Sequence, residues 1–396
     1  MQLEERGLIF DAARQPDEAR VNAFTSVARL TSGLLIAGHQ SGSAKHAIDA
    51  TLRLNRSNDG GRTWETIPFR FATSLDGKPG SLSSGDIVEL PSGRLLITGT
   101  WFDRSDPSRP LFDPQTQGIL HSRQVLAVSD DQGMTWGPWK VIPTPGLKGC
   151  ASTGPMLSWS DGTIAAAFES YKEYDDPGPA HHAAWLIVSH DGGKTFPDMH
   201  LVAQHPEHAI FFWDQRLCAG KMAGEYFALF WTHDLVHQQD LNVHFKHGAL
   251  GEGAPVRRGS PDPADPSIKD TAIPGQIAAP LLLDDGRLLA FVVDRHRPGS
   301  MTLWCSHDQG LTWPEKEKLV VHWHDERAAL TQQGATVDYN EYWDDMLKWS
   351  FGHPALVDLK NGKALCVFYA GTPGALSIHW ARIDLGGRSS NRAGNR

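Results

Sequence analysis

The sequence predicts an all-β fold, a six-bladed β-propeller of four-stranded antiparallel blades. Short apolar runs bounded by Gly, Pro, Asp and Ser, two turn motifs that recur along the chain, and a scarcity of helical periodicity all indicate it. A propeller suits such repeats because each blade is one small sheet and the closed ring protects the sheet edges. We expect one domain over residues 1–385, followed by a polar, disordered tail over residues 386–396.

The first repeated motif is a turn glycine between two apolar runs. Its copies are spaced by 60, 69, 62, 62 and 76 residues, and they are Gly33, Gly93, Gly162, Gly224, Gly286 and Gly362. Glycine suits a tight turn because it adopts positive φ without steric cost. Six such turns, each joining the first two strands of a unit, predict six units.

The second motif reads S-x-D-x-G-x-T-[WF] and occurs four times, at residues 57–64, 129–136, 189–196 and 306–313. The side chains of its aspartates, Asp59, Asp131, Asp191 and Asp308, can accept hydrogen bonds from backbone N–H groups within the turn. We therefore expect these turns to join the last two strands of a blade and to stabilise it, without a part in catalysis.

At these four segments the chain resembles the sialidase (neuraminidase) superfamily, whose blades carry this motif as the Asp-box or BNR repeat. The resemblance implies a six-bladed propeller from Arg20 to about Asp384. The superfamily includes sialidases, other exo-acting glycosidases, lyases and proteins that only bind sugars, so the resemblance alone does not choose among these functions.

Candidate site residues follow from the geometry of a blade. Both tight turns lie at one end of the blade, so the longer loops lie at the other end, where functional residues concentrate. Near the axis at that end we expect the ends of the second strands and the starts of the first strands, and both sets are polar. The catalytic candidates are His39, Asp49, Asp214, His353 and Tyr369, and the substrate-binding candidates are Gln40, Trp101, Glu169, Arg216, His233, Asp234, Asp294 and Arg295.

The family resemblance implies three arginines that hold a substrate carboxylate, an aspartate acid/base, and a tyrosine nucleophile assisted by a glutamate. Asp49 resembles that aspartate. The chain departs from the pattern twice, because Asn22 stands where the first arginine is expected and His353 stands where the tyrosine is expected. A histidine near neutrality could instead move a proton beside a uronate carboxylate, which is lyase chemistry.

Composition excludes several function classes. The chain has 37 basic and 46 acidic side chains, a net charge of −9, and no basic stripe, so we expect no nucleic-acid partner. No apolar run is long enough to span a bilayer and the first residues lack a signal-peptide pattern, so we expect a cytoplasmic protein. Four well-separated cysteines and scattered histidines form no ligand pattern, and we expect neither a metal nor a cofactor.

The sequence therefore predicts a sialidase-like exo-glycosidase that acts on a terminal, acidic sugar in a central pocket. Two alternatives remain: a uronate-directed lyase that uses histidine as its base, and a non-catalytic propeller that binds a glycan or a protein. Loops over residues 100–123 and 322–350, the second with a short helix over 325–332, are expected to fold over the pocket.

Overall fold

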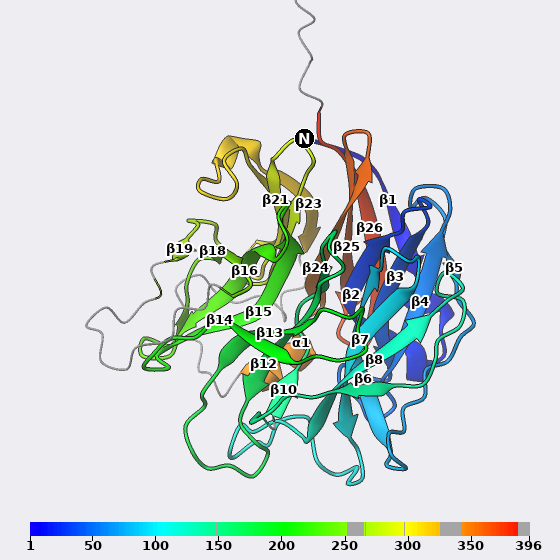
Figure 1. The fold of residues 1–396 in the computed structure, drawn as a ribbon, viewed down its shortest axis with the longest axis vertical. Coiled ribbons are helices and arrows are strands. Elements are labelled where there is room, and N and C mark those ends of the chain that lie inside the picture. Colours follow the sequence, from blue (N-terminus) through cyan, green and yellow to red (C-terminus); the bar gives the residue numbers. More distant parts are fainter. Residues whose placement is uncertain (148, 252–264, 266, 297, 325–341, 387–396) are drawn as a thin grey trace, which may run out of the picture.

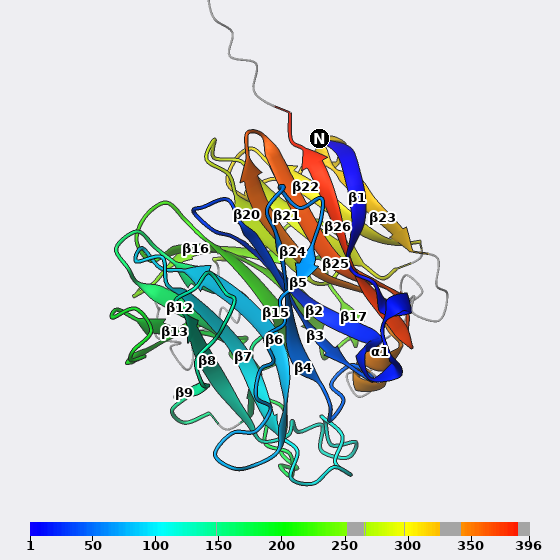
Figure 2. The same ribbon diagram turned by 90° about the vertical axis from the view of Figure 1, so that its right-hand side faces the viewer.

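The computed structural model describes residues 1–147, 149–251, 265, 267–296, 298–324 and 342–386. In these ranges the chain consists of small β-sheets arranged around a common centre, with one short α-helix, α1 (Tyr342–Lys348) (Figure 1, Figure 2). The helix expected over 325–332 and all of the expected tail except Gly386 lie outside the described residues. No helix in the described part is long and apolar enough to cross a membrane.

The strands form five hydrogen-bonded sheets, and the largest has eight strands. Its order is β24-β25-β26-β2-β3-β4-β5, with β1 paired to β26. Its members are β1 (Gln2–Phe10), β2 (Val21–Arg29), β3 (Leu35–Gly42), β4 (Thr51–Ser57), β5 (Glu65–Thr66), β24 (Phe351–Lys360), β25 (Lys363–Thr372) and β26 (Ala375–Asp384).

The other four sheets follow one another along the chain. The first contains β6 (Gly80–Glu89), β7 (Leu95–Asp103), β8 (Ser122–Ser129) and β9 (Lys140–Ile142). The second contains β10 (Gly149–Ala151), β11 (Met156–Ser158), β12 (Ile164–Tyr171), β13 (Ala183–Ser189) and β14 (Asp198–Ala203). The third contains β15 (Ile210–Ala219), β16 (Glu225–Asp234), β17 (Gln239–Asp240), β18 (His244–Ala249) and β19 (Ile268–Asp270). The fourth contains β20 (Ala278–Leu282), β21 (Leu288–Asp294), β22 (Gly299–Ser306) and β23 (Leu319–His324).

The expected set of six separate sheets is thus met only in part, because four sheets stand apart and the remaining strands form the eight-stranded sheet. Within that sheet β2 and β26 are joined by a single parallel pair, Val21 with Leu376. Three short 3-10 helices, η1 (Ala12–Arg14), η2 (Asp17–Ala19) and η3 (Glu315–Glu317), complete the described elements.

One strand of each sheet, and two of the large sheet, lie innermost. These inner strands contact one another in a closed ring, in the order β2, β6, β11, β15, β20, β24 and back to β2. A cavity of about 380 Å³ runs along this ring and is lined by residues from all six strands. The ring surrounds a single axis, as a propeller requires.

The turn glycines lie where the sequence predicted them, with φ between 73° and 91° at all six positions. The register shows which turns share an end of the molecule: Leu35 pairs with Arg29 on one side and with Ser57 on the other. The glycine turn and the S-x-D-x-G-x-T turn therefore lie at the same end, which we call the turn face. The opposite end, which we call the loop face, carries the longer connections.

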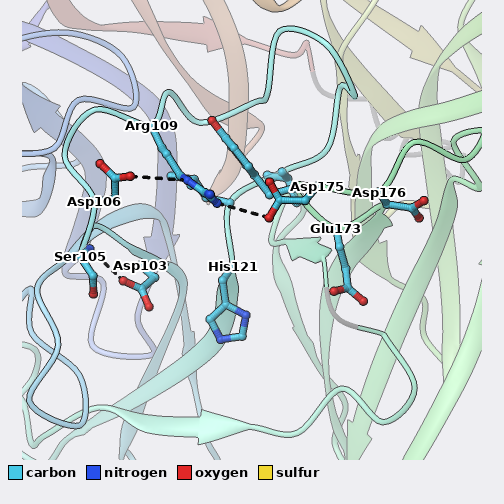
Figure 3. A pocket seen from close by; sticks show the side chains of 11 residues that line it. Asp103, Ser105, Asp106, Arg109, His121, Glu173, Asp175 and Asp176 are labelled. Carbon is cyan, nitrogen blue, oxygen red and sulfur yellow. Dashed lines mark hydrogen bonds and ion pairs between the residues drawn. The ribbon is translucent and has the colours of Figure 1, made fainter.

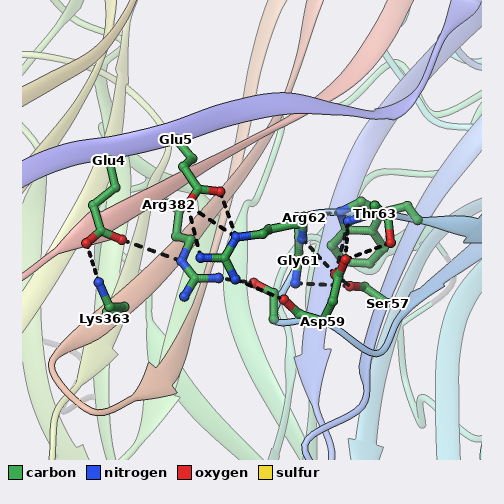
Figure 4. Close-up of polar contacts among 11 residues, drawn as sticks. Glu4, Glu5, Ser57, Asp59, Gly61, Arg62, Thr63, Lys363 and Arg382 are labelled. Carbon is green, nitrogen blue, oxygen red and sulfur yellow. Dashed lines mark hydrogen bonds and ion pairs between the residues drawn. The ribbon is translucent and has the colours of Figure 1, made fainter.

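The four S-x-D-x-G-x-T turns repeat one hydrogen-bond pattern. In the first, Ser57 Oγ donates to Asp59 Oδ1 at 2.8 Å, Gly61 N donates to Ser57 Oγ at 3.0 Å, and Thr63 Oγ1 donates to Asp59 Oδ2 at 2.7 Å (Figure 4). The same contacts recur around Asp131, Asp191 and Asp308. The prediction that these aspartates organise turns is confirmed.

The amino-terminal strand, which the sequence reading did not predict, adds to the ring at its seam. β1 pairs antiparallel with β26, so the first and last strands of the described chain lie side by side (Figure 2). Ion pairs reinforce the join: Glu5 accepts from Arg62 Nε at 2.9 Å, and Glu4 contacts Lys363 and Arg382 (Figure 4). All four cysteines are free thiols, and three of them are buried.

The S-x-D-x-G-x-T turns allow a stability prediction with an adjacent control. Asp131→Ala removes a carboxylate that Ser129 and Thr135 donate to, and we expect it to lower the free energy of unfolding by about 1 to 3 kcal/mol at pH 7. Asp130 points to solvent and pairs only with Arg94 among the described residues, so Asp130→Ala should cost less than about 1 kcal/mol. Denaturant unfolding measures both values.

The pH dependence of this effect has a defined sign. Hydrogen bonds from Thr135, opposed by slight burial, hold the pKa of Asp131 below its usual value of 3.8. A depressed pKa stabilises the fold above the unfolded pKa, and this stabilisation is lost as the pH falls through the folded pKa. The stability difference between wild type and Asp131→Ala should therefore shrink below about pH 4. A constant difference from pH 7 to pH 3 would contradict it.

Candidate active site

The inner strands share an unusual backbone feature near the axis. Phe24, Ser84, Asp214 and His353 adopt left-handed conformations, with φ of 55°, 61°, 46° and 52°. Each lies at an irregularity in the pairing between its inner strand and the next strand of the sheet. Left-handed non-glycine residues are strained, and such strain concentrates at functional sites. We call these four irregular positions the kinks, and they lie near the axis on the side of the loop face.

A group of polar side chains converges at these kinks, and we call it the central cluster. Six of its members were predicted from the sequence, and the seventh was not. The members are Lys45, Glu169, Asp214, Arg216, Arg295, His353 and Tyr369. All except Asp214 are buried, and the Asp214 side chain retains 24% of its exposed surface. Asp214 is therefore the cluster member that solvent or a ligand reaches most readily.

Glu169 and Asp214 form a carboxylate pair. Glu169 is fully buried, and its Oε1 accepts from Thr153 Oγ1 at 2.7 Å and from Gln215 N at 2.8 Å. Burial, and next the charge of Asp214, raise the pKa of Glu169 to about 8. Burial also raises the pKa of Asp214, while Arg216 and Arg295 oppose that rise. Burial therefore favours the protonated form of Glu169 beside the more exposed Asp214.

His353 holds Arg216 rather than acting as a free base. Its Nδ1 lies 3.2 Å from the carbonyl oxygen of Thr25, and its Nε2 contacts Arg216 Nη2. A carbonyl only accepts and a guanidinium only donates, so Nδ1 carries the proton and Nε2 accepts. Burial, and next the charge of Arg216, lower the pKa of His353 well below its usual range. The catalytic role predicted for His353 is thus better described as positioning, because both ring nitrogens are engaged.

Tyr369 and Arg295 pack closely because Gly352 has no side chain. Arg295 Nη2 donates to Phe351 O at 3.0 Å, and its guanidinium lies 4.1 Å from the ring centre of Trp349. A Cβ on Gly352, which has φ of 143°, would lie 2.2 Å from Arg295 Nη2 and 3.4 Å from the Tyr369 hydroxyl. The glycine makes room for both groups. Burial raises the pKa of Tyr369, and Arg295 partly offsets this rise.

Lys45 is the member that sequence reasoning missed. It lies on the loop after β3, where no strand periodicity marks it, and its Nζ donates to Met346 O at 2.9 Å, to Tyr369 Oη at 3.2 Å and to Trp349 O. No carboxylate pairs with it among the described residues. Burial, and next the charge of Arg295, lower the pKa of Lys45 well below 10.5. Burial therefore disfavours the charged form of this amine, and no carboxylate among the described residues offsets that effect.

Three predicted residues lie in the packed core instead. His39 is fully buried, its ring centre is 4.9 Å from that of Phe10, and burial and then Arg53 lower its pKa to about 3. Gln40 Nε2 donates to Leu82 O at 3.2 Å, between two sheets, and Trp101 packs in an apolar core and donates to Thr73 O at 2.8 Å. The prediction misplaced them because the neighbouring sheets, and not the position along the strand alone, decide which side chains pack in the core.

The remaining candidates lie around the cluster or away from it. His233 Nδ1 is 3.1 Å from Asp240, Asp240 Oδ2 accepts from Gln276, and Gln276 accepts from Arg295, so His233 supports the cluster indirectly. Asp234 accepts from two N–H groups of its own loop, and Asp294 accepts from His296. Asp49 is exposed and accepts from Ser43, so the position resembling an acid/base aspartate does not join the cluster.

A separate cavity of about 630 Å³ opens on the loop face and is acidic (Figure 3). Its carboxylates belong to Asp103, Asp106, Glu173, Asp175 and Asp176. Arg109 bridges two of them, with Asp106 at 3.6 Å and Asp175 at 3.4 Å (Figure 3). An excess of carboxylates repels an acidic sugar, so this cavity does not suit the substrate expected from the sequence. Among the described residues, no group of three or more His, Cys, Asp or Glu is placed to hold a metal.

Comparison with known proteins supports the fold. No family model matches the chain. A sialidase of Vibrio cholerae is 28% identical over 124 residues, an alignment that covers 30% of this chain and 14% of that protein. The chain therefore corresponds to only a small part of this curated relative.

Two solved structures resemble nearly the whole chain. An α-L-arabinanase of Penicillium chrysogenum, complexed with arabinobiose, has a TM-score of 0.62 at 14% identity and covers 97% of this chain and 99% of its own. An intramolecular trans-sialidase of Ruminococcus gnavus, in complex with oseltamivir carboxylate, has a TM-score of 0.58 at 12% identity, with coverage of 95% and 97%. The chain is thus a sialidase-like β-propeller in fold.

The carboxylate pair can be tested without knowing the substrate. Asp214→Asn removes the like charge beside Glu169, so the pKa of Glu169 should fall below about 8 and stay above its usual 4.5 because burial remains. Carboxyl ¹³C NMR titration, with the Glu169 signal assigned by its loss in Glu169→Gln, measures this shift. Asp234→Asn is the control and should leave the signal unchanged. An unaltered pKa in Asp214→Asn would show that the two carboxylates do not interact.

Proposed function

We propose that the chain is a hydrolase that removes a terminal, acidic sugar at the central cluster. The observation that carries this proposal is the carboxylate pair of Glu169 and Asp214 beside two buried arginines, Arg216 and Arg295. Most glycoside hydrolases cleave with two carboxyl groups, one protonated to release the leaving oxygen and one ionised. The raised pKa of Glu169 and the exposure of Asp214 match these two states.

In this proposal Asp214 is the ionised carboxylate that faces the sugar, and Glu169 holds the proton of the pair. Arg216 contacts Asp214 at 3.4 Å and favours its ionised form. Tyr369, which is close enough for Asp214 to affect its pKa, is the second group available to the anomeric carbon. His353 keeps Arg216 in place beside Asp214.

The acidic character of the sugar follows from charge. The Nε atoms of Arg216 and Arg295 are buried and have no hydrogen-bond partner among the described residues, and Lys45 lacks an anionic partner there. With Glu169 neutral, Asp214 and Asp86, whose pKa burial raises to about 7 against the charge of Arg216, do not fully balance the two arginines. A substrate carboxylate would restore the balance and accept from guanidinium groups.

We also propose to count six blades, with the eight-stranded sheet taken as two. Its two halves meet at the single pair of Val21 and Leu376, and each half contributes one strand to the inner ring. On this count the proposed site lies on the axis of the wheel, bordered by every blade.

The product distinguishes the three functions. We expect the purified chain to release a reducing acidic sugar from a panel of aryl glycosides, sialosides and oligo-uronates, and to act at least about tenfold less well on the methyl ester of its best substrate. A product with the near-ultraviolet absorbance of an unsaturated uronate would identify a lyase and contradict hydrolysis. Binding without turnover would identify a glycan-binding protein.

The role of Glu169 has its own test. Glu169→Gln should lower kcat by about 10² to 10⁴ for a substrate with an alkyl leaving group, because the proton donor is lost. A 2,4-dinitrophenyl leaving group needs no proton, so kcat for that substrate should fall far less. Glu173→Gln, in the acidic cavity outside the cluster, is the matched control and should resemble wild type. Equal losses with both leaving groups would exclude Glu169 as the proton donor.

A further inference from the structure

A third cavity, of about 420 Å³, lies on the loop face beside the central cluster. Three segments form its walls: the loop after β3 from Lys45 to Ile48, part of the loop after β7 over 104–117, and the end of α1 with Met346 and Leu347. Nothing in the proposed reaction uses this cavity. Its volume lies in the range of small-molecule sites.

The wall of this cavity is apolar and open to solvent. Of the eight large apolar side chains that the described chain exposes, two line it: Ile48 at 53% and Leu347 at 51% exposed. The loop after β7 adds Leu111, Phe112 and the prolines Pro107, Pro110 and Pro114. Exposed apolar side chains that gather around a cavity favour an apolar occupant.

Two charged groups of the wall are already engaged with the protein, whereas His46 Nδ1 and Gln117 Oε1 are buried without a hydrogen-bond partner among the described residues. Arg104 donates to His46 O at 2.6 Å and to Ser81 Oγ at 2.8 Å. Asp113 accepts from the N–H groups of Gln115 and Thr116 in its own loop. An occupant therefore meets mainly alkyl and ring surface. A sugar, which needs several hydrogen bonds, fits this wall less well than an aromatic or alkyl group.

The cavity adjoins the central cluster. Lys45 lines the cavity, and its Nζ lies 3.2 Å from the Tyr369 hydroxyl. His46 lines it too, and the ring of Phe24 lies 4.6 Å from that of His46 and 5.1 Å from that of His353. The Lys45 side chain and the rings of Phe24 and His46 therefore lie between the cavity and the cluster, so a group bound in the cavity lies one side chain away from the cluster.

We propose that this cavity binds the leaving group of the substrate, and that the leaving group is apolar, an aromatic or alkyl alcohol joined to the sugar. This proposal rests on the proposed function, since a leaving group exists only if the cluster cleaves a glycosidic bond. The neighbouring acidic cavity shares Arg109 with this one, but its carboxylates make it unsuitable for an apolar group. The enzyme would thus act on the acidic-sugar conjugates of hydrophobic alcohols.

Direct binding tests the cavity without requiring turnover. The probe is 2-naphthol, titrated calorimetrically into the full chain. Leu347→Asp places a charge in the wall and should weaken binding by about tenfold or more, as rejection by an apolar pocket does. Met222→Asp alters another exposed apolar residue, 68% exposed, in the β15–β16 turn on the turn face, and should bind like wild type. Equal binding by Leu347→Asp and wild type overturns the proposal.

Kinetics then connect the cavity to the reaction. For the acidic sugar that the enzyme cleaves, the ratio of kcat/KM for the octyl glycoside to that for the methyl glycoside should fall about tenfold in Leu347→Asp and stay constant in Met222→Asp. An unchanged ratio in Leu347→Asp overturns the leaving-group role. Specific 2-naphthol binding in a protein that cleaves no glycoside would uphold the apolar site and reject the proposed function, so the two failures are distinguishable. Thermal midpoints, and Leu347→Ser as a milder variant, exclude unfolding as the cause.

Discussion

Two guanidinium groups buried at the axis set the constraint on which the rest of the site depends. Arginine stays charged, so each group needs acceptors or rings around it wherever it is buried. Arg216 obtains them from Asp214 and His353, and Arg295 from Phe351 O, Gln276 and the ring of Trp349. Asp214 and His353, which contact Arg216, both have a left-handed backbone. The absence of a side chain at Gly352 leaves room for the guanidinium of Arg295.

The difference between local and long-range interactions explains which parts could be predicted from the sequence. Turn glycines such as Gly33 and the four aspartate turns depend on local chemistry, and both are as expected. They also identify the face of the molecule, which led to Asp214, Arg216, Arg295 and Tyr369. The positions that long-range packing decides could not be predicted in this way. His39 packs against Phe10 in the core, and the parallel pair of Val21 and Leu376 joins two predicted blades into one sheet.

Stability and chemistry are separated between the two faces. The turn face is held by short hydrogen bonds within each S-x-D-x-G-x-T segment, so a change there acts mainly on one turn. The loop face carries the strained kinks, the buried charges and the apolar cavity, where one side chain contacts groups from several elements. Lys45 is the clearest case, since it joins the loop after β3 to α1 and to β25.

At Asn22 the chain departs from the sialidase pattern, and its third basic side chain at the axis is Lys45. Asn22 is fully buried, and its Nδ2 donates to Ala19 O at 3.1 Å and to Leu376 O at 2.9 Å, so it supports the seam where β2 meets β26. An arginine in that place would lose these seam contacts. Lys45 instead approaches the axis from the loop after β3 and reaches Tyr369 beside Arg295. Because the same lysine lines the apolar cavity, the loop after β3 contributes both to the central cluster and to the proposed leaving-group pocket, and under that proposal a change in the loop affects both.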